Sequence, residues 1–176
     1  MRILTLCGSL RAQSSNCALL RAYERLVPSG IDFERYEKLG ELPHFNPDLD
    51  GKTVPDEIGA LRGLIAAADA LLISTPEYAH GLPGAFKNAL DWLVSDPALA
   101  GKPVVILHAS RGSTWALDSL REVLQTMAAR IIESASVSLP LGSTQLDTDA
   151  ILARDDLRQL LSHSIEALEN DAKLQP

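Results

Sequence analysis

The chain has 176 residues, 46% hydrophobic and 22% charged, with a formal net charge of −7. This composition is typical of a soluble globular protein, and the length suits a single domain spanning residues 1–176. The acidic balance argues against nucleic-acid and anionic-membrane partners, and no apolar run reaches the roughly 18 residues that a membrane span needs.

Apolar runs predict strands, and apolar residues at helical spacing predict helices. In chain order the predicted elements are strand 3–7, helix 17–23, strand 31–36, helix 56–68, strand 70–75, helix 85–94, strand 104–109, helix 115–129, strand 130–139 and helix 149–172. The segment 39–55 is rich in Gly, Pro, Asn and Asp. We predict a long loop there, with a functional role or an oligomer contact.

Five strands alternating with five helices predict an α/β fold. The expected architecture is flavodoxin-like: a doubly wound, five-stranded parallel sheet of order 2-1-3-4-5 with helices on both faces. The first, third and fourth strands are the most apolar and should be central. Ligands of such sheets bind outside the carboxyl ends of the strands, so the loops after these three strands should share one pocket.

The loop after the first strand has the composition of an anion site. Ser9, Ser14, Ser15 and Asn16 supply short polar side chains, and Arg11 supplies a planar cation, next to the free N–H groups of a helix N-terminus. The alternative is that Ser14, Ser15 and Asn16 only cap the helix. Neither GxxxxGK[ST] nor GxGxxG is present, which argues against a P-loop nucleotide or a Rossmann-bound dinucleotide.

The loops after the third and fourth strands complete the predicted pocket. The first of these contains the only carboxylate near the pocket, Glu77, and a histidine, His80, for which a role in shape or hydrogen bonding is favoured over proton shuttling. The other runs from Ser110 to Trp115. No pairing of acidic residues with histidine at metal-ligand spacing is found, so no metal site is predicted.

The two cysteines, Cys7 and Cys17, suggest no disulfide framework, and Cys7 is interpreted as a small core residue. A reduced, cytoplasmic setting follows from that interpretation. Trp92 lies on a helix with Phe86, Leu90 and Leu93, where core or subunit packing is favoured over ligand stacking.

Two motifs resemble the NADPH-dependent FMN reductase family, which includes quinone and chromate reductases. They are Gly8-Ser9-Leu10-Arg11 with Ser14 and Asn16, and Pro76-Glu77-Tyr78 through Gly81, continued by Leu82-Pro83-Gly84 and Lys87 to Trp92. The resemblance implies that Ser9, Arg11, Ser14 and Asn16 hold an FMN phosphate and that Pro76, Glu77 and Tyr78 border the flavin ring. The full set of expected FMN contacts is Ser9, Arg11, Ser14, Ser15, Asn16, Pro76, Glu77, Tyr78, Ala79, His80, Gly81, Ser110 and Gly112.

The resemblance also implies an FMN-dependent oxidoreductase that takes hydride from NADPH or NADH and reduces a small acceptor: a quinone, an azo compound, a metal oxyanion or a flavin. No catalytic protein side chain is required, and a homodimer or homotetramer is expected. The alternatives are a flavodoxin-like FMN electron carrier without NAD(P)H turnover and a non-catalytic sensor of a phosphate-bearing ligand. Ala79 and the segment from Ser110 to Trp115 depart from the family pattern, which has Asn after the tyrosine and a glycine-rich third loop.

Overall fold

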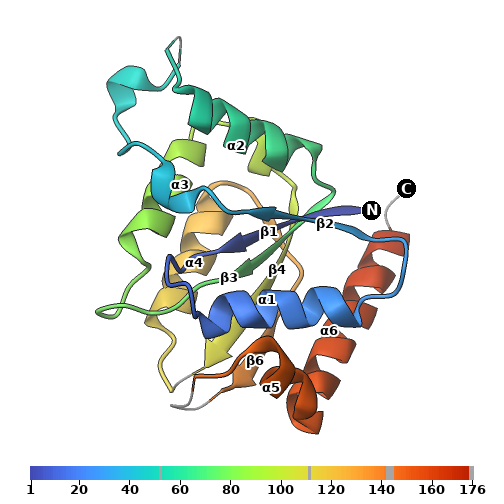
Figure 1. The fold of residues 1–176 in the computed structure, drawn as a ribbon. Helices are drawn as coiled ribbons and strands as arrows, with labels where there is room; N and C mark the ends of the chain where they lie inside the picture. Colours follow the sequence, from blue (N-terminus) through green and yellow to red (C-terminus); the bar gives the residue numbers. More distant parts are fainter. Residues whose placement is uncertain (52, 111, 142–144, 175–176) are drawn as a thin grey trace.

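The computed structural model describes residues 1–51, 53–110, 112–141 and 145–174, and of Ser110 the backbone (Figure 1). The strands are β1 (Arg2–Cys7), β2 (Asp32–Tyr36), β3 (Ala70–Ser74), β4 (Pro103–Ser110), β5 (Arg130–Ile131) and β6 (Val137–Pro140). The helices are α1 (Ser15–Leu26), α2 (Asp56–Ala67), α3 (Gly84–Leu93), α4 (Trp115–Thr126), α5 (Thr148–Ala153) and α6 (Asp155–Lys173). Short 3-10 helices occupy Leu39–Glu41, Pro47–Leu49 and Pro97–Leu99.

The strands form one parallel sheet in the order β2-β1-β3-β4-β5, which confirms the predicted topology. The three apolar strands β1, β3 and β4 are adjacent, as their composition requires of strands covered on both faces. The loops that follow them therefore leave the sheet at the same end.

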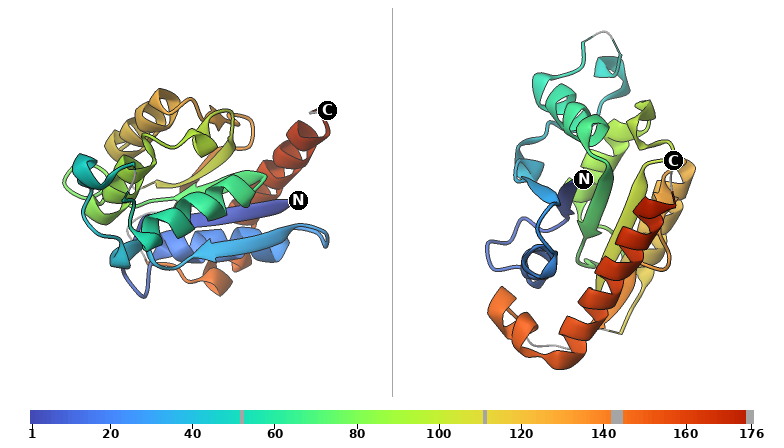
Figure 2. Two further views of the ribbon diagram at one scale, coloured as in Figure 1. Left: turned by 90° about the horizontal axis from the view of Figure 1, so that it is seen from above. Right: turned by 90° about the vertical axis from the view of Figure 1, so that its right-hand side faces the viewer.

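Helices cover both faces of the sheet (Figure 2). On one face, Leu4 and Leu71 pack with residues of α2, α3 and α4. On the other, Ile3 and Leu72 pack with residues of α1, α5 and α6. Successive residues of a strand point to opposite faces, so each central strand supplies both cores. Across the part of the chain that is described, every helix is too short or too polar to span a bilayer.

The predicted fifth strand, 130–139, is in fact two strands, which corrects the expectation of a single one. β5 pairs with the start of β4, whereas β6 pairs with its end, residue 137 lying opposite residue 107. Between them the chain turns, since the Ala135 N–H donates to the carbonyl of Ile132, and both side chains are buried. This turn interrupts the pairing and lets β6 extend the edge of the sheet toward the carboxyl ends of the strands.

The predicted last helix is also divided. α5 and α6 are separated by Arg154, whose backbone is extended (φ −87°, ψ 114°). The side chain of Asp147 caps α5 by accepting the Ala150 N–H. Ile151 and Leu157, one on each side of the break, are both fully buried. The break allows each helix to direct its own apolar side chains into the core.

The 39–55 segment packs on α3. Trp92 Nε1 donates to the carbonyl of Pro43 at 2.8 Å, and Asn88 Nδ2 donates to the same oxygen at 2.9 Å. The Phe45 ring meets the Trp92 ring edge to face at 5.0 Å, and Trp92 is fully buried. The interpretation of Trp92 as a packing residue is confirmed. This segment of the same chain therefore covers part of the apolar surface of α3, and the core covers the rest of its buried side chains.

Candidate functional site

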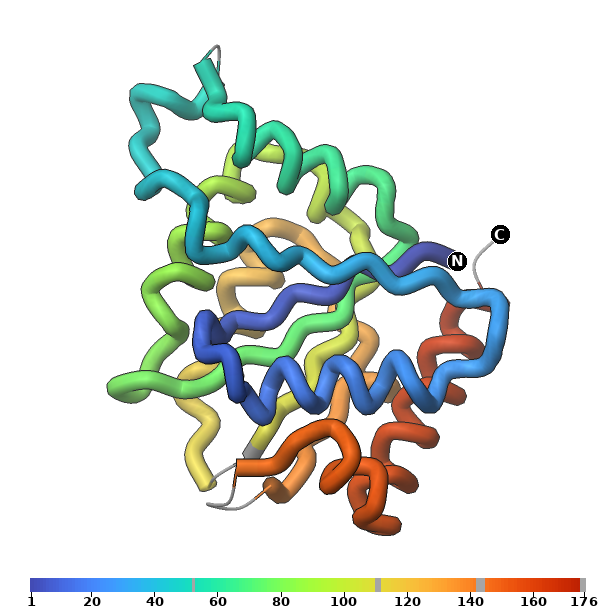
Figure 3. Tube along the Cα trace, in the orientation of Figure 1, coloured from blue at the N-terminus to red at the C-terminus, as the bar shows by residue number. Residues whose placement is uncertain are grey.

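A cleft of about 220 Å³ lies at the carboxyl ends of the central strands. The loops after β1 and β3 and the end of β4 line it, together with Gln145 from the segment after β6. In the trace of Figure 3, these chain segments converge at one end of the molecule. This is the position predicted from the order of the strands.

Three serine hydroxyls, at and just after the loop between β1 and α1, each accept a hydrogen bond from a backbone N–H group. The Oγ of Ser9 accepts the Arg11 N–H, that of Ser14 accepts the Cys17 N–H, and that of Ser15 accepts the Leu146 N–H. A hydroxyl that accepts a backbone N–H still has its own proton to donate. All three line the cleft and are at most 9% exposed, so together they offer three oriented donors.

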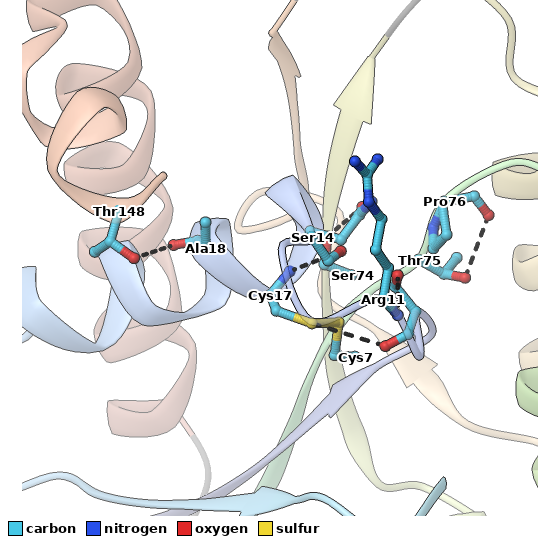
Figure 4. The surroundings of a disulfide bond; sticks show 11 residues. Cys7, Arg11, Ser14, Cys17, Ala18, Ser74, Thr75, Pro76 and Thr148 are labelled. Atoms are coloured by element: carbon cyan, nitrogen blue, oxygen red, sulfur yellow. Dashed lines mark hydrogen bonds between the residues drawn. A yellow bond between two sulfur atoms is a disulfide. The ribbon is translucent and has the colours of Figure 1, made fainter. Parts of the chain in front are cut away.

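Arg11 adds charge to this loop. Its side chain is exposed and lines the cleft together with Ser14; both are labelled in Figure 4. Among the described residues it has no ion pair, so its guanidinium is free for an anionic ligand. Ser14 is also the N-cap of α1, so helix capping and anion binding are compatible functions of the same residue.

Asn16 and Gly8 fasten this loop to β3. The carboxamide oxygen of Asn16 accepts the Ser74 hydroxyl at 2.9 Å, and both side chains are buried. A Cβ at Gly8 would lie 2.1 Å from Thr75 Oγ1, so only glycine allows the two strands' ends to approach this closely. Asn16 therefore positions the loop as well as lining the cleft.

Cys7 and Cys17 form a disulfide, which corrects the expectation that neither cysteine is paired. Cys7 ends β1 and Cys17 lies in the first turn of α1. The intervening loop turns back on itself and brings their Cα atoms to 5.6 Å, within the range of a disulfide (Figure 4). The pairing was not predicted from the sequence because Cys7 lies in a strand and Cys17 in a helix, and their separation depends on the path of the loop between them.

The loop after β3 begins with a tight hairpin. Tyr78 and Gly81 exchange two backbone hydrogen bonds, and the two central residues, Ala79 and His80, have φ values of +49° and +57°. Two positive φ values in succession define a type I′ turn, which favours Asn-Gly over the residues found here. Because side chains with a Cβ disfavour this region, the turn carries local strain.

Replacing Ala79 with asparagine is expected to raise the free energy of unfolding by about 0.5–1 kcal/mol, because asparagine tolerates a positive φ. Chemical denaturation measures the change. The matched control is Ala66→Asn, at an exposed position inside α2, where the same substitution should be destabilising because asparagine is a weak helix former. Equal destabilisation at both sites would contradict the strain argument.

Glu77 joins the second and third loops. One carboxylate oxygen accepts the Ser113 hydroxyl at 2.6 Å, and the other accepts the Ala116 N–H at the start of α4 at 3.0 Å. These two hydrogen bonds hold the pKa of Glu77 below its usual value, so the side chain is a carboxylate at neutral pH. Beside it, the His80 and Trp115 rings stack at 5.7 Å, and Trp115 is 60% exposed.

The structure brings most of the predicted residues into the cleft. Its lining includes Ser9, Arg11, Ser14, Ser15, Asn16, Pro76, Glu77 and Tyr78. Ala79, His80 and Gly81 form the hairpin beyond this lining, and Gly112 (φ +102°) also lies outside it. Ser110 is the last residue of β4, and its side chain falls outside the described part of the chain.

Several lining residues were not predicted, among them Gln13, Thr75, His108, Ser113 and Gln145. His108 breaks the apolar run of β4 near its carboxyl end, a signal that could have identified it. Burial lowers the pKa of His108, which favours the neutral imidazole. Gln145 follows β6 and had no comparable signal, because its proximity to the cleft depends on the path of the chain after that strand.

Comparison with known proteins provides the family context. The sequence profile of the family described as NADPH-dependent FMN reductase matches residues 1–144. An NAD(P)H-dependent FMN reductase of Pseudomonas aeruginosa is 33% identical over 174 residues, which cover 96% of this chain and 94% of the relative. A 2-hydroxy-1,4-benzoquinone reductase of a Burkholderia species is 33% identical over 168 residues, covering 92% and 90% of the two chains.

A solved structure agrees with these relatives. The flavoenzyme NAD(P)H:(acceptor) oxidoreductase FerB of Paracoccus denitrificans superposes with a TM-score of 0.74 at 26% identity. The match covers 96% of this chain and 97% of FerB.

Proposed function

The chain belongs to the NADPH-dependent FMN reductase family, and on that premise we propose that the cleft holds FMN with its phosphate on the loop between β1 and α1. The protein is an oxidoreductase that uses FMN and NAD(P)H. When bound, FMN accepts hydride from the nicotinamide and passes electrons on to the acceptor. The observation that carries the placement is the set of three oriented serine hydroxyls in one cleft with Arg11, which forms no ion pair within the described part of the chain.

The residues present fit a phosphate monoester. Three hydroxyl protons, the N-terminus of α1 and a guanidinium provide donors and positive charge on one side of the cleft. The second side, formed by Pro76, Glu77 and Tyr78, would border the flavin ring. The N–H groups of Tyr78 and Gly81 are engaged in the hairpin, so the N–H groups of Glu77, Ala79 and His80 are the ones we assign to stabilising negative charge on the ring.

The acceptor that we propose is a planar small molecule of the quinone class. Tyr78 (52% exposed) lines the cleft and Trp115 (60% exposed) precedes the lining residue Ala116, so both offer exposed rings on which a planar acceptor could stack. The benzoquinone reductase among the relatives supports this choice.

Replacing Trp115 with alanine is expected to raise KM for a benzoquinone about 2- to 12-fold, the loss of one aromatic stacking contact of about 0.5–1.5 kcal/mol. Steady-state kinetics with a quinone and with ferricyanide provide the comparison, because an inorganic acceptor does not stack. An equal effect on both acceptors would contradict a stacking role for Trp115.

A homodimer or homotetramer is part of the proposal. Of the large apolar side chains that are exposed in the described residues, Leu10 and Tyr78 lie on the loops after β1 and β3 and Trp115 is the first residue of α4, where a second copy would cover them. Light scattering that finds a fully active monomer would contradict it. We also propose a cytoplasmic location, where NAD(P)H is supplied, to be tested by cell fractionation.

The decisive experiment is anaerobic mixing of the FMN-loaded protein with NADPH or NADH in the absence of an acceptor. Loss of the yellow absorbance is expected. His80→Ala should keep the rate within about tenfold, because loss of a general acid or base costs roughly 10²–10⁴. A yellow protein that neither nucleotide bleaches would be an electron carrier, and a protein that binds no FMN would favour the sensor.

A further inference from the structure

The disulfide closes the base of the proposed phosphate loop. Cys7 and Cys17 flank residues 8–16, the segment that contains all the serine donors and Arg11. Cys17 Sγ lies 3.9 Å from the carbonyl oxygen of Ser9, and the Cys17 N–H donates to Ser14 Oγ. Cys17 thus contacts two donor residues of the loop, and its contact with Ser14 is drawn in Figure 4.

A second cleft, of about 250 Å³, opens onto this disulfide. Both cysteines line it, and each is partly exposed rather than buried in the core. This cleft and the first one share Ser9 and Arg11, so the two lie on either side of the same loop. A small molecule in the second cleft can therefore reach the sulfur atoms without entering the first.

The second cleft has a positive lining. Arg11, Arg21 and Arg35 border it, against one acidic side chain, Glu37. Arg35 is paired with Glu24, whereas Arg11 and Arg21 have no ion pair among the described residues. Two unpaired guanidinium groups beside a disulfide favour a thiol that carries carboxylates.

We propose that the second cleft is a site of thiol–disulfide exchange with small anionic thiols, and that opening the Cys7–Cys17 bond weakens FMN binding. This inference rests on the proposed placement of the FMN phosphate. It assigns a function to the two cysteines, which the oxidoreductase reaction itself does not require.

The exchange proceeds in two balanced steps. The incoming thiol loses its proton to solvent, and its thiolate attacks Cys7 Sγ. A new sulfur–sulfur bond forms there, the Cys7–Cys17 bond breaks, and the electron pair leaves on Cys17. That thiolate lies in the first turn of α1, where the helix N-terminus stabilises negative charge. A second thiolate then displaces Cys7, so that two thiols are oxidised to one disulfide and the protein gains two electrons.

Opening the bond affects the loop in two ways. The two ends of the segment 8–16 are no longer covalently linked, so the loop has more conformational freedom in the absence of FMN. FMN binding must then order the loop, and this loss of conformational entropy weakens the observed affinity. A carboxylate-bearing adduct on Cys7 would also attract the guanidinium of Arg11 away from the phosphate.

The test uses the FMN-loaded protein and reduced glutathione under anaerobic conditions. Mass spectrometry should detect a single glutathione adduct on Cys7, followed by two free thiols. At matched thiolate concentration, glutathione should react about tenfold faster than cysteamine, a cationic thiol, and Arg21→Gln should reduce this preference severalfold. Arg21→Gln should leave FMN affinity within about twofold, because Arg21 does not line the first cleft.

The effect on the cofactor is measured by fluorescence titration. FMN should bind about tenfold more weakly to the opened protein, and riboflavin, which lacks the phosphate, should bind both forms equally. The opened form is prepared either with the double substitution Cys7→Ser and Cys17→Ser or by reduction of the native protein with dithiothreitol. If the double variant folds poorly, the titration is carried out on the reduced native protein.

Two results would overturn the proposal: a disulfide that stays closed in millimolar glutathione, or one that opens while the FMN Kd stays within about twofold. A separate measurement tests the phosphate placement. If Arg11→Ala leaves the FMN Kd of the oxidised protein unchanged, the phosphate does not bind at this loop. If Arg11→Ala does weaken FMN binding, an FMN Kd that opening of the disulfide leaves unchanged contradicts the proposal on the disulfide alone.

Discussion

Replacing Arg11 with alanine is expected to weaken FMN binding by about 1.5–3 kcal/mol, or about 10- to 150-fold in Kd, the value of a hydrogen bond to a charged group. The side chain lines the cleft next to the serine donors, and no acidic side chain among the described residues forms an ion pair with it. Its charge is therefore available to the phosphate. Quenching of FMN fluorescence measures the change.

Three controls make the Arg11 result specific. Riboflavin should bind the native and Arg11→Ala proteins equally, because it has no phosphate. Arg11→Lys keeps the charge but not the planar fork, so its loss should be intermediate. Lys173→Ala removes an equal charge at the end of α6 and should leave FMN binding unchanged. If the Arg11→Ala protein bound FMN with native affinity, the phosphate would not be bound at this loop.

Replacing Trp92 with alanine is expected to lower the free energy of unfolding by about 3–5 kcal/mol, the largest stability effect that we predict. The side chain is fully buried between α3 and the 39–55 segment, in contact with the Phe45 ring. Its removal leaves a cavity. The carbonyl of Pro43 keeps the Asn88 donor, so the cavity and not an unpaired acceptor should dominate the cost.

Chemical denaturation of two further variants checks this assignment. Trp92→Phe keeps an aromatic ring but is smaller and loses the N–H donor, and it should cost about 1–2 kcal/mol. Val94→Ala, at the 62% exposed C-cap of α3, should cost less than about 0.5 kcal/mol. If Trp92→Ala lowered the free energy of unfolding no more than Val94→Ala does, the packing of the 39–55 segment on Trp92 would not contribute to stability.

The sheet was predictable because its central strands have a strong, local signal. The apolar runs of β1, β3 and β4 are each bounded by polar turns, and alternation with helices then leaves few topologies. β6 was missed as a separate strand because a four-residue strand has too few residues to show its own period. The break at Arg154 was missed because helical spacing continues across it, although Asp155 and Asp156 are typical of a helix start.

The site was predictable where its chemistry lies in one stretch. Ser9, Arg11 and Ser14 stand together in the sequence, and the structure places all three in the cleft. The contacts that depend on distant segments were not predictable. Gln145 reaches the cleft by the path of the chain after β6, and the Cys7–Cys17 bond depends on the return of a nine-residue loop.

The hydrogen bonds that reach the phosphate loop from beyond β6 have a consequence for protein synthesis. Leu146 donates to the Ser15 hydroxyl, Gln145 donates to the Gln13 carbonyl, and α5 and α6 cover α1. The loop is synthesised before these partners, which follow it at sequence separations of 131 and 132 residues. A nascent chain arrested after α4 would already contain every serine of the loop, but it would lack the Leu146 N–H that orients Ser15 and the helices that cover α1. Cofactor capture is therefore expected to follow synthesis of residues 145–173, so that chains arrested after α4 should bind FMN more weakly than the full fold.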